Sequence, residues 1–356
     1  MKYGNRGILM QTEGRVYYLD LLRALAIMLV FTGHTVSSFG ASAITGPLRF
    51  GGTGVDLFFL LSGWLIGSQL YKEHQKFGSI DIPRFWMRRW MRTMPAYFAV
   101  LLLTLTQLYI TKDNVASPIP YFLFIQNYFT PLPYFSISWS LAVEEQFYLV
   151  VAPLILVLST LNKRFIELLV LVSILLSPSL FRELGWFNSL AETHVRWDCC
   201  IMGIILAFIK NRFGKFWGIL SNNATAICVL AALLYIAFFY FRWSPPVDNY
   251  SDPSKLVLAL VFAGLVVKAV STPVAKLPFA HTLIMHISTR SYSIYLLHAD
   301  ALALTKRLFD TSYIPIYYVC ALVLSLIMAE ILYRIVEIPF INLRDRFSCS
   351  SKRQLA

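Results

Sequence analysis

The residues best suited to chemistry lie in one apolar segment, Tyr18–Val36. Arg23 stands near its start and His34 near its end, eleven residues further on. Eleven residues of α-helix return to nearly the same face and span roughly 16 Å along the axis. Charged and titratable side chains are expensive inside a membrane, so they usually face an interior cavity and serve a function. One face of this segment is therefore predicted to be a polar path, with a fixed cation near one end and a proton-handling imidazole near the other.

A pair of carboxylates opens another apolar segment, which reads SWSLAVEEQFYLVVAP. Glu144 and Glu145 enter the apolar region from the side on which His34 ends its own segment, and at least one of them must point away from lipid. A carboxylate can orient an imidazole and stabilise its cation. Glu144 and His34 are therefore candidates for a catalytic pair. The alternative is that the two carboxylates lie in a wet vestibule without chemistry.

A cluster of arginines precedes a third apolar segment, in the stretch DIPRFWMRRWMRTMP. Arg89 and Arg92 are three residues apart, on one helical face, and Arg88 adjoins them. Guanidinium groups bind phosphates with two hydrogen bonds, so the cluster is a candidate cytoplasmic clamp for a phosphate or nucleotide. It is also compatible with an anchor that contacts anionic lipid headgroups. The spacing alone does not separate the two.

Four further polar residues in apolar segments are predicted to line the interior: Asp56, Ser62, His298 and Glu337. The first two follow a glycine-rich start, GGTG, which we expect to let another backbone approach closely. A capping aspartate in a tightly packed helix is the alternative for Asp56. His298 is either a lining residue or an outer-edge histidine in water. Glu337 ends the last span on the inner side, the side on which the arginine cluster also lies.

The elements that position these residues are predicted to be membrane-spanning helices. The chain has 356 residues, 57% of them hydrophobic and only 14% charged, with a mean hydropathy of +0.62. Apolar runs of about 20 residues recur along its length. We expect an all-α polytopic membrane protein with about ten spans, at roughly 18–38, 52–71, 93–111, 138–160, 164–181, 197–209, 223–241, 255–271, 286–305 and 314–335.

The distribution of basic residues predicts the orientation. With the N-terminus in the cytoplasm, the inner segments hold roughly three times as many Lys and Arg residues as the outer ones. Both termini are then cytoplasmic, with Arg23 near the inner face and His34 near the outer face. The net charge of +12 reflects this orientation, and no nucleic-acid partner is expected. We expect residues 1–345 to form one transmembrane domain, without a cleavable signal peptide, and residues 346–356 a short cytoplasmic tail.

The cysteines and histidines do not predict a metal site. The five cysteines form no CxxC motif and no Cys/His cluster, and four of them fall in apolar spans. No metal and no disulfide framework are therefore expected. A Gly-x-Ser-x-Gly motif and a His-x-x-x-x-Asp motif are also absent from the sequence, which argues against a serine hydrolase or a soluble-type glycerolipid acyltransferase.

Taken in order, the segments resemble the acyltransferase family 3 membrane proteins, which O-acylate surface sugars and lipids. The matching stretches are LDLLRALAIMLVFTGH, GGTGVDLFFLLSGWLIG, RRWMRTMP, WSLAVEEQFYL, SYSIYLLH and EIPF, and they run from the first span to the last. Arg23 with His34 matches the family's Arg–ten residues–His motif. Arg89 and Arg92 match its Arg-x-x-Arg, and Glu144 matches the acid of its Trp-Ser-Leu-x-x-Glu segment. The chain resembles the members that carry no fused esterase-like domain.

The resemblance implies an O-acetyltransferase of the bacterial inner membrane, with acetyl-CoA as cytoplasmic donor and a glycan, lipopolysaccharide or other glycolipid as acceptor. No permanently bound cofactor is expected, and the chain could form a homo-oligomer. Arg89 and Arg92, with Arg88, would hold CoA phosphates, and Arg23 would hold the donor near the inner mouth. His34, oriented by Glu144, would act as general base or relay the acyl group covalently.

Two other functions remain open from the sequence. A proton-coupled transporter also uses intramembrane Arg, His and Glu, but the sequence has no internal repeat and no paired Gly/Pro-broken spans of the kind such folds often show. A non-catalytic subunit of a polysaccharide system would explain the spans, but not the titratable residues inside them.

Overall fold

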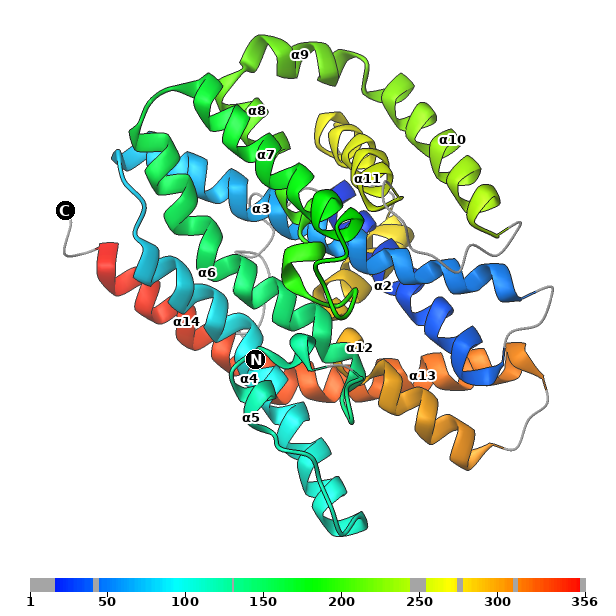
Figure 1. Ribbon diagram of the computed structural model, residues 1–356. Helices are drawn as coiled ribbons and strands as arrows, with labels where there is room; N and C mark the ends of the chain where they lie inside the picture. The colour runs from blue at the N-terminus through cyan, green and yellow to red at the C-terminus, as the bar shows by residue number, and fades with distance from the viewer. Residues whose placement is uncertain are drawn as a thin grey trace.

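The computed structural model describes residues 17–40, 45–129, 131–243, 254–273, 278–309 and 313–352. These residues form helices and connecting turns without a strand, so the predicted all-α class is confirmed (Figure 1). The helices are α2 (Tyr17–Phe39), α3 (Gly54–Phe77), α4 (Ile82–Thr111), α5 (Ile119–Phe122), α6 (Trp139–Thr160), α7 (Arg164–Glu183), α8 (Asp198–Arg212), α9 (Gly214–Asn222), α10 (Ala224–Trp243), α11 (Ser254–Ser271), α12 (Pro278–Leu308), α13 (Ile314–Leu332) and α14 (Ile338–Lys352).

Short irregular helices complete these elements. A π-helical turn, Tyr333–Glu337, joins α13 to α14, and 3₁₀ turns cover Gly46–Thr53, Gln126–Tyr128, Ser136–Ser138 and Thr193–Val195. A π-turn inside a long helix often marks a functional position. Residues 1–16, for which no signal peptide is predicted, and residues 353–356, the end of the predicted tail, lie outside the described residues.

By length and composition, six segments of the described chain could cross a membrane, and seven if α9 and α10, bent by 69°, count as one. The protein is therefore a polytopic membrane protein. The count is lower than the ten spans predicted. Part of the difference lies at α8, whose 15 residues are short of the roughly 20 that a span requires.

The start of α4 differs from the prediction. The sequence places the third span at 93–111, with the arginine cluster in the loop before it, whereas the helix begins at Ile82. The Asp81 side chain accepts the backbone N–H of Arg84 at 3.1 Å, and Pro83 occupies the first turn, which are both favourable at a helix N-terminus. The cluster therefore lies on the helix itself, which carries its side chains into the bundle.

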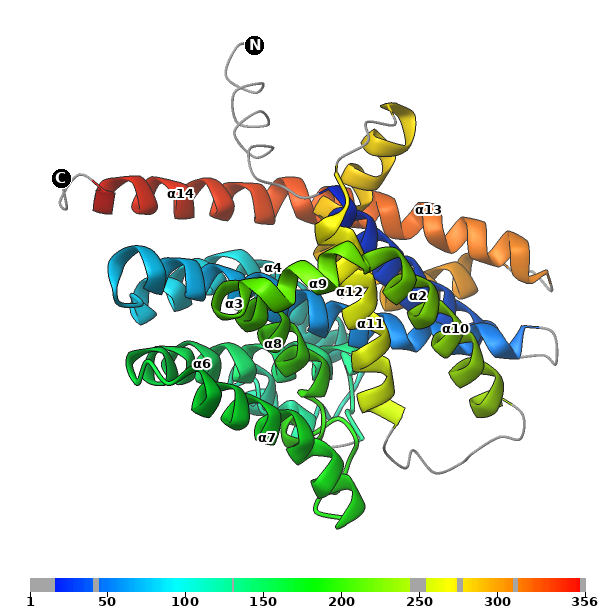
Figure 2. The same cartoon turned by 90° about the horizontal axis from the view of Figure 1, so that it is seen from above.

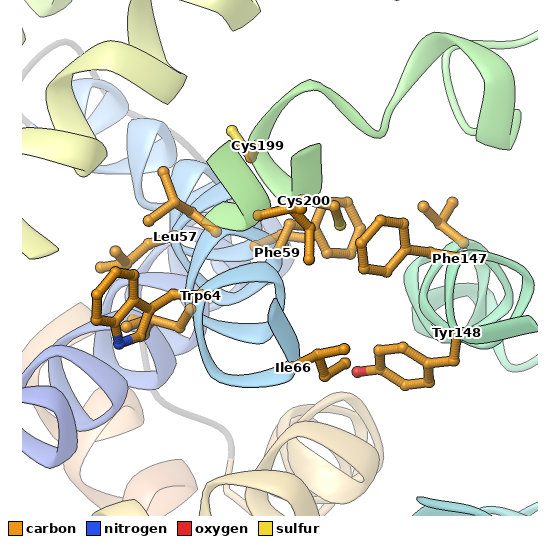
Figure 3. Close-up of a cluster of buried hydrophobic side chains, with 14 of the residues drawn as sticks. Leu57, Phe59, Trp64, Ile66, Phe147, Tyr148, Cys199 and Cys200 are labelled. Carbon is orange, nitrogen blue, oxygen red and sulfur yellow. The ribbon is translucent and has the colours of Figure 1, made fainter. Parts of the chain in front are cut away.

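Helix α3 is the centre of the bundle and packs most extensively against α8. A Cβ atom on Gly63 would lie 1.9 Å from the carbonyl oxygen of Cys200, and one on Gly203 would lie 2.3 Å from that of Leu60. The two backbones are thus in direct contact, as small residues allow in membrane helices. Figure 3 shows Cys199 and Cys200 of α8 and Phe147 and Tyr148 of α6 around the apolar side chains of α3.

Helix α2 is held between the start of α3 and the two helices α12 and α13. A Cβ on Gly51 would lie 2.1 Å from the carbonyl oxygen of Leu29, and one on Gly54 would lie 2.4 Å from that of Ala26. The prediction that the GGTG stretch admits another backbone is confirmed at these two glycines. This close approach determines the position of α2 along its axis and its rotation about that axis, and therefore the positions of Arg23 and His34.

The outside of the bundle is apolar. Figure 2 shows α7 and α14 on opposite sides, with α3 and α4 between them. Helix α7 carries an exposed stripe of large apolar side chains: Phe165, Leu169, Leu176 and Leu180. Such a stripe would promote aggregation in water, whereas in a bilayer it faces lipid.

Candidate active site

A cavity of about 780 Å³, including its open mouth, lies among α2, α3, α4, α6 and α12. Its charged lining consists of Arg23, Arg89, Arg92 and Glu144, with Ser62 beside them. The structure thus brings together candidates that the sequence places on four different segments. Three guanidinium groups against one carboxylate give the cavity a positive potential, which favours an anionic ligand.

The two neighbouring arginines of α4 have different surroundings. Arg89 donates from Nη2 to the Tyr148 hydroxyl at 2.6 Å, and its guanidinium lies 4.3 Å from the centre of the same ring. Arg92 is exposed at the cavity and makes no hydrogen bond or ion pair with another residue that the structure describes. Arg92 therefore keeps its donors available for a ligand, whereas Arg89 is largely committed to Tyr148. Arg88 does not line the cavity.

Glu144 ends a chain of hydrogen bonds that crosses the cavity wall. The Ser62 hydroxyl donates to Glu144 Oε1 at 2.7 Å, and Tyr148 donates to Ser62 Oγ at 3.3 Å. Because Arg89 donates to Tyr148, the chain joins a cation to a carboxylate through two hydroxyls. The neighbouring Glu145 accepts from the Thr93 hydroxyl at 2.7 Å. Both carboxylates therefore face the bundle interior, which confirms that at least one points away from lipid.

Arg23 is held at the cavity by a residue that the sequence prediction missed. Its Nη1 lies 3.0 Å from Asp20 Oδ1, and this buried carboxylate also accepts from the Ser288 hydroxyl of α12 at 2.6 Å. The signal was present in the sequence, because an acid three residues before an arginine shares its helical face. Asp20 thus fixes the Arg23 guanidinium between α2 and α12.

The predicted pairing of His34 with Glu144 is wrong. His34 Nδ1 lies 2.7 Å from Nε2 of His298, and the two rings stack with centroids 4.9 Å apart. No hydrogen bond or ion pair joins His34 to Glu144, and His34 does not line the cavity. The physical reason is the packing of the helices, because α12 lies against α2 whereas α6 packs against α3. Polarity and spacing along the chain do not reveal that choice.

Tyr295 of α12 connects the cavity with the two histidines, a role that was not predicted from the sequence. It lines the cavity, and its ring centroid lies 5.6 Å from that of His298. Its hydroxyl lies 2.5 Å from Ser140 Oγ and donates to the carbonyl of Ile137 at 3.1 Å. Tyr295 is therefore held through its hydroxyl, and it contacts both the charged cavity and the ring of His298.

Of the four further lining residues predicted from the sequence, Ser62 alone lines this cavity. Asp56 is buried and pairs instead with Arg196 at 3.2 Å and Lys255 at 3.0 Å. Glu337, in the π-turn, accepts a hydrogen bond from Ser293, and His298 pairs with His34. Each of the three has partners from another helix, so burial alone did not distinguish a lining residue from an internal contact.

The described residues contain no group of three or more His, Cys, Asp or Glu side chains arranged to hold a metal ion. The groups at the site are a positively charged cavity, in which Arg92 has no hydrogen-bond or ion-pair partner among the described residues, and an imidazole pair beside Tyr295.

A protein-family model described as "Acyltransferase domain" matches residues 16–334 of the 356. It spans every helix that contributes to the cavity and to the imidazole pair. The chain belongs to this acyltransferase family. The resemblance inferred from the sequence motifs is thereby confirmed.

Two relatives from Staphylococcus aureus carry names that describe an activity. O-acetyltransferase OatA of strain NCTC 8325 / PS 47 is 30% identical over 90% of this chain and 56% of its own length. A protein of strain COL, provisionally named an O-acetyltransferase, is 30% identical over the same shares. The chain thus spans a little over half the length of the relatives it matches. No solved structure matches the chain.

Proposed function

We propose that this protein is a membrane O-acyltransferase, and more narrowly an O-acetyltransferase. It moves an acyl group from cytoplasmic acyl-CoA to a hydroxyl of a cell-surface or lipid-linked carbohydrate. The observation that carries the proposal is the positively charged cavity, lined by Arg23, Arg89, Arg92 and Glu144, within the segment that matches the acyltransferase family. The names of the relatives support acetyl as the acyl group.

The proposed orientation has both termini in the cytoplasm of a bacterial cell, with the protein in the inner membrane. The excess of basic residues in the predicted inner segments supports it. In this orientation the arginines of α4 and Arg23 are near the cytoplasmic face, so that acyl-CoA reaches them without crossing the membrane.

Arg92 is the proposed main contact of the CoA phosphates, since its guanidinium is exposed at the cavity and has no hydrogen-bond or ion-pair partner among the described residues. A guanidinium can bind a phosphate with two parallel hydrogen bonds. Arg23, held by Asp20, adds a second cation, and Arg88 adds a contact outside the cavity lining. Arg89 acts with them through charge, while its hydrogen bond to Tyr148 shapes the wall.

The proposed chemistry takes place at His34. Its imidazole takes the proton of the acceptor hydroxyl, the oxygen attacks the thioester carbonyl, and the C–S bond breaks to release CoA. In a two-step variant the His34 imidazole attacks the thioester carbonyl first, so that the C–S bond breaks, CoA leaves and acyl-His34 forms. The acceptor oxygen then attacks the acyl carbon, the C–N bond to His34 breaks, and the hydroxyl proton passes to the released imidazole. Glu144 serves in the cavity as the end of the hydrogen-bond chain that begins at Arg89, rather than as the partner of His34.

The proposal is tested by supplying purified protein in liposomes with isotopically labelled acetyl-CoA and a membrane carbohydrate fraction. We expect the label to appear in the carbohydrate as an ester with the mass of an added acetyl group, and free CoA to appear in equal amount. Protein-dependent movement of a solute, without ester formation, would favour the proton-coupled transporter instead.

A further inference from the structure

The imidazole of His298 is one of the most completely enclosed polar groups in the described chain. It has no exposed surface, although it lies on a helix that also lines the cavity. Its Nδ1 lies 2.6 Å from the backbone carbonyl oxygen of Tyr295, and its Nε2 lies 2.7 Å from Nδ1 of His34. Both of its ring nitrogens therefore have a partner within the protein, and no carboxylate of the described residues is hydrogen-bonded to it.

These two contacts determine where the protons lie. A carbonyl oxygen can only accept, so Nδ1 of His298 must carry a hydrogen. A second hydrogen, on Nε2, would make His298 a cation in a fully enclosed site without an acidic partner, which is costly. His298 is therefore neutral, and its Nε2 offers a lone pair to His34.

The direction of the hydrogen bond between the rings follows. Two facing nitrogens 2.7 Å apart share a single hydrogen, and that hydrogen belongs to Nδ1 of His34. The remaining nitrogen of His34, Nε2, then carries the lone pair. His34 is half-buried, so this nitrogen belongs to the less enclosed of the two rings.

We propose that His298 is a positioning residue, which holds His34 in the one tautomer whose Nε2 can accept a proton from a substrate hydroxyl. The proposal rests on the proposed function of His34 as general base. A neutral imidazole supported by a main-chain carbonyl thus has the orienting role that a carboxylate has in many hydrolases. When Nε2 takes the proton, Nδ1 of His34 keeps its hydrogen and still donates to His298, so no second proton has to move.

The support of His298 is itself rigid. Tyr295, whose carbonyl accepts the Nδ1 hydrogen, is held through its hydroxyl by Ser140 and by the carbonyl of Ile137. The residue that carries this carbonyl is therefore held by the 3₁₀ turn before α6 and by the start of α6, as well as by its own helix. A purely structural tie between α2 and α12 would need neither a particular tautomer nor an acceptor at this position.

Three variants separate the positioning role from a structural one. His298→Leu fills similar space but removes the acceptor, and His298→Gln places an amide oxygen where Nε2 accepted. Leu302→Ala loosens the same α2–α12 interface, where Leu302 packs with Phe31, without touching either imidazole. Turnover and the KM for acetyl-CoA are measured for each variant in liposomes, with the amount of folded protein determined by size-exclusion chromatography.

We expect His298→Leu to lower kcat by about 10²-fold or more while the KM for acetyl-CoA changes less than threefold, because donor binding uses other residues. His298→Gln should recover at least about tenfold of this loss, and Leu302→Ala should keep a near-normal kcat. A His298→Leu enzyme with wild-type turnover would overturn the proposal. So would equal losses in the Leu and Gln variants. An inactive wild-type protein would instead overturn the proposed function.

The tautomer can also be read without activity. ¹⁵N-histidine labelling and solid-state NMR distinguish a protonated from an unprotonated ring nitrogen, and the six histidines can be assigned by single substitution. We expect His34 in the wild type to show a protonated Nδ1 and an unprotonated Nε2, joined through Nδ1 to His298. A His34 ring protonated on Nε2 would contradict the proposal even if the leucine variant failed to fold.

Discussion

Two arginines one helical turn apart on α4 have different partners, and this decides what each contributes. Arg89 donates to the Tyr148 hydroxyl and stacks on its ring, whereas Arg92 is exposed at the cavity. The sequence placed both on one face but could not distinguish them, because Tyr148 belongs to another helix. The same limit explains the histidines. The motif predicted that His34 is important, and the partner His298 became visible only with the packing of α12.

We therefore predict that Arg92→Ala raises the KM for acetyl-CoA by about 10- to 100-fold with little loss of folded protein. The reason is the loss of charge-assisted hydrogen bonds to phosphate, worth about 1.5–3 kcal/mol. Initial rates over a range of acetyl-CoA concentrations measure the effect. Arg164→Ala, which removes an exposed arginine at the start of α7, is the control. An unchanged KM for the Arg92 variant would leave this arginine with a lipid-anchoring role.

Arg89→Ala is expected to behave differently. It removes the donor to Tyr148 and the first member of the chain that ends at Glu144, so the cavity wall should loosen. We predict a lower thermal stability in detergent and a higher KM for acetyl-CoA. Arg89→Lys should recover only part of both losses, because lysine lacks the planar guanidinium group. A variant as stable as the Arg92→Ala protein would show that the Tyr148 contact contributes little.

At the scale of the helices, close backbone contacts set the positions of the site residues. The glycine-rich start of α3 predicted that another backbone approaches, but not that α2 is the neighbour there and α8 the neighbour further along. The arginine cluster also shows the limit of hydropathy. Because of its charges, the residues before 93 were predicted to form a loop. The helix instead begins at Ile82, with Asp81 as its N-cap and Pro83 in its first turn. Helix caps identify such a start better than apolar length does.

The contact between α3 and α8 gives a prediction for stability. In Gly203→Ala the new methyl group would overlap the carbonyl oxygen of Leu60, so the helices must separate. Overpacking of this kind typically costs about 1–3 kcal/mol. We expect a lower midpoint of thermal unfolding in detergent and a lower yield. Gly218→Ala on α9, where an added Cβ meets no atom within 4 Å, should change neither. Equal stability of the two variants would contradict the packing.

For the whole molecule, the sequence predicted the class well and the number of spans less well. Composition and apolar runs identify a polytopic helical membrane protein, and the motifs identify its family. The helices described here support six or seven spans by length and composition, because a helix such as α8 is buried among others rather than long enough to cross by itself. Such a helix is apolar for reasons of packing, which hydropathy cannot distinguish from lipid contact.

The proposed orientation is tested with reporter fusions. A reporter after Lys76 or at the C-terminus should read cytoplasmic, and one near Asn249, which lies outside the described residues, should read external. The expected result follows from the roughly threefold excess of basic residues on the predicted inner side. An external C-terminus would contradict the proposed orientation, and would remove the argument that the arginines of α4 face cytoplasmic acyl-CoA.

The most direct test of the account is the rate of acetyl transfer by purified His34→Ala protein, measured together with its affinity for acetyl-CoA. The account predicts that turnover falls by about 10²- to 10⁴-fold, the usual cost of removing a general base, and further if His34 carries the acyl group. Acetyl-CoA should bind with nearly unchanged affinity, because His34 does not line the cavity that holds the arginines. Wild-type turnover in this variant would contradict the account.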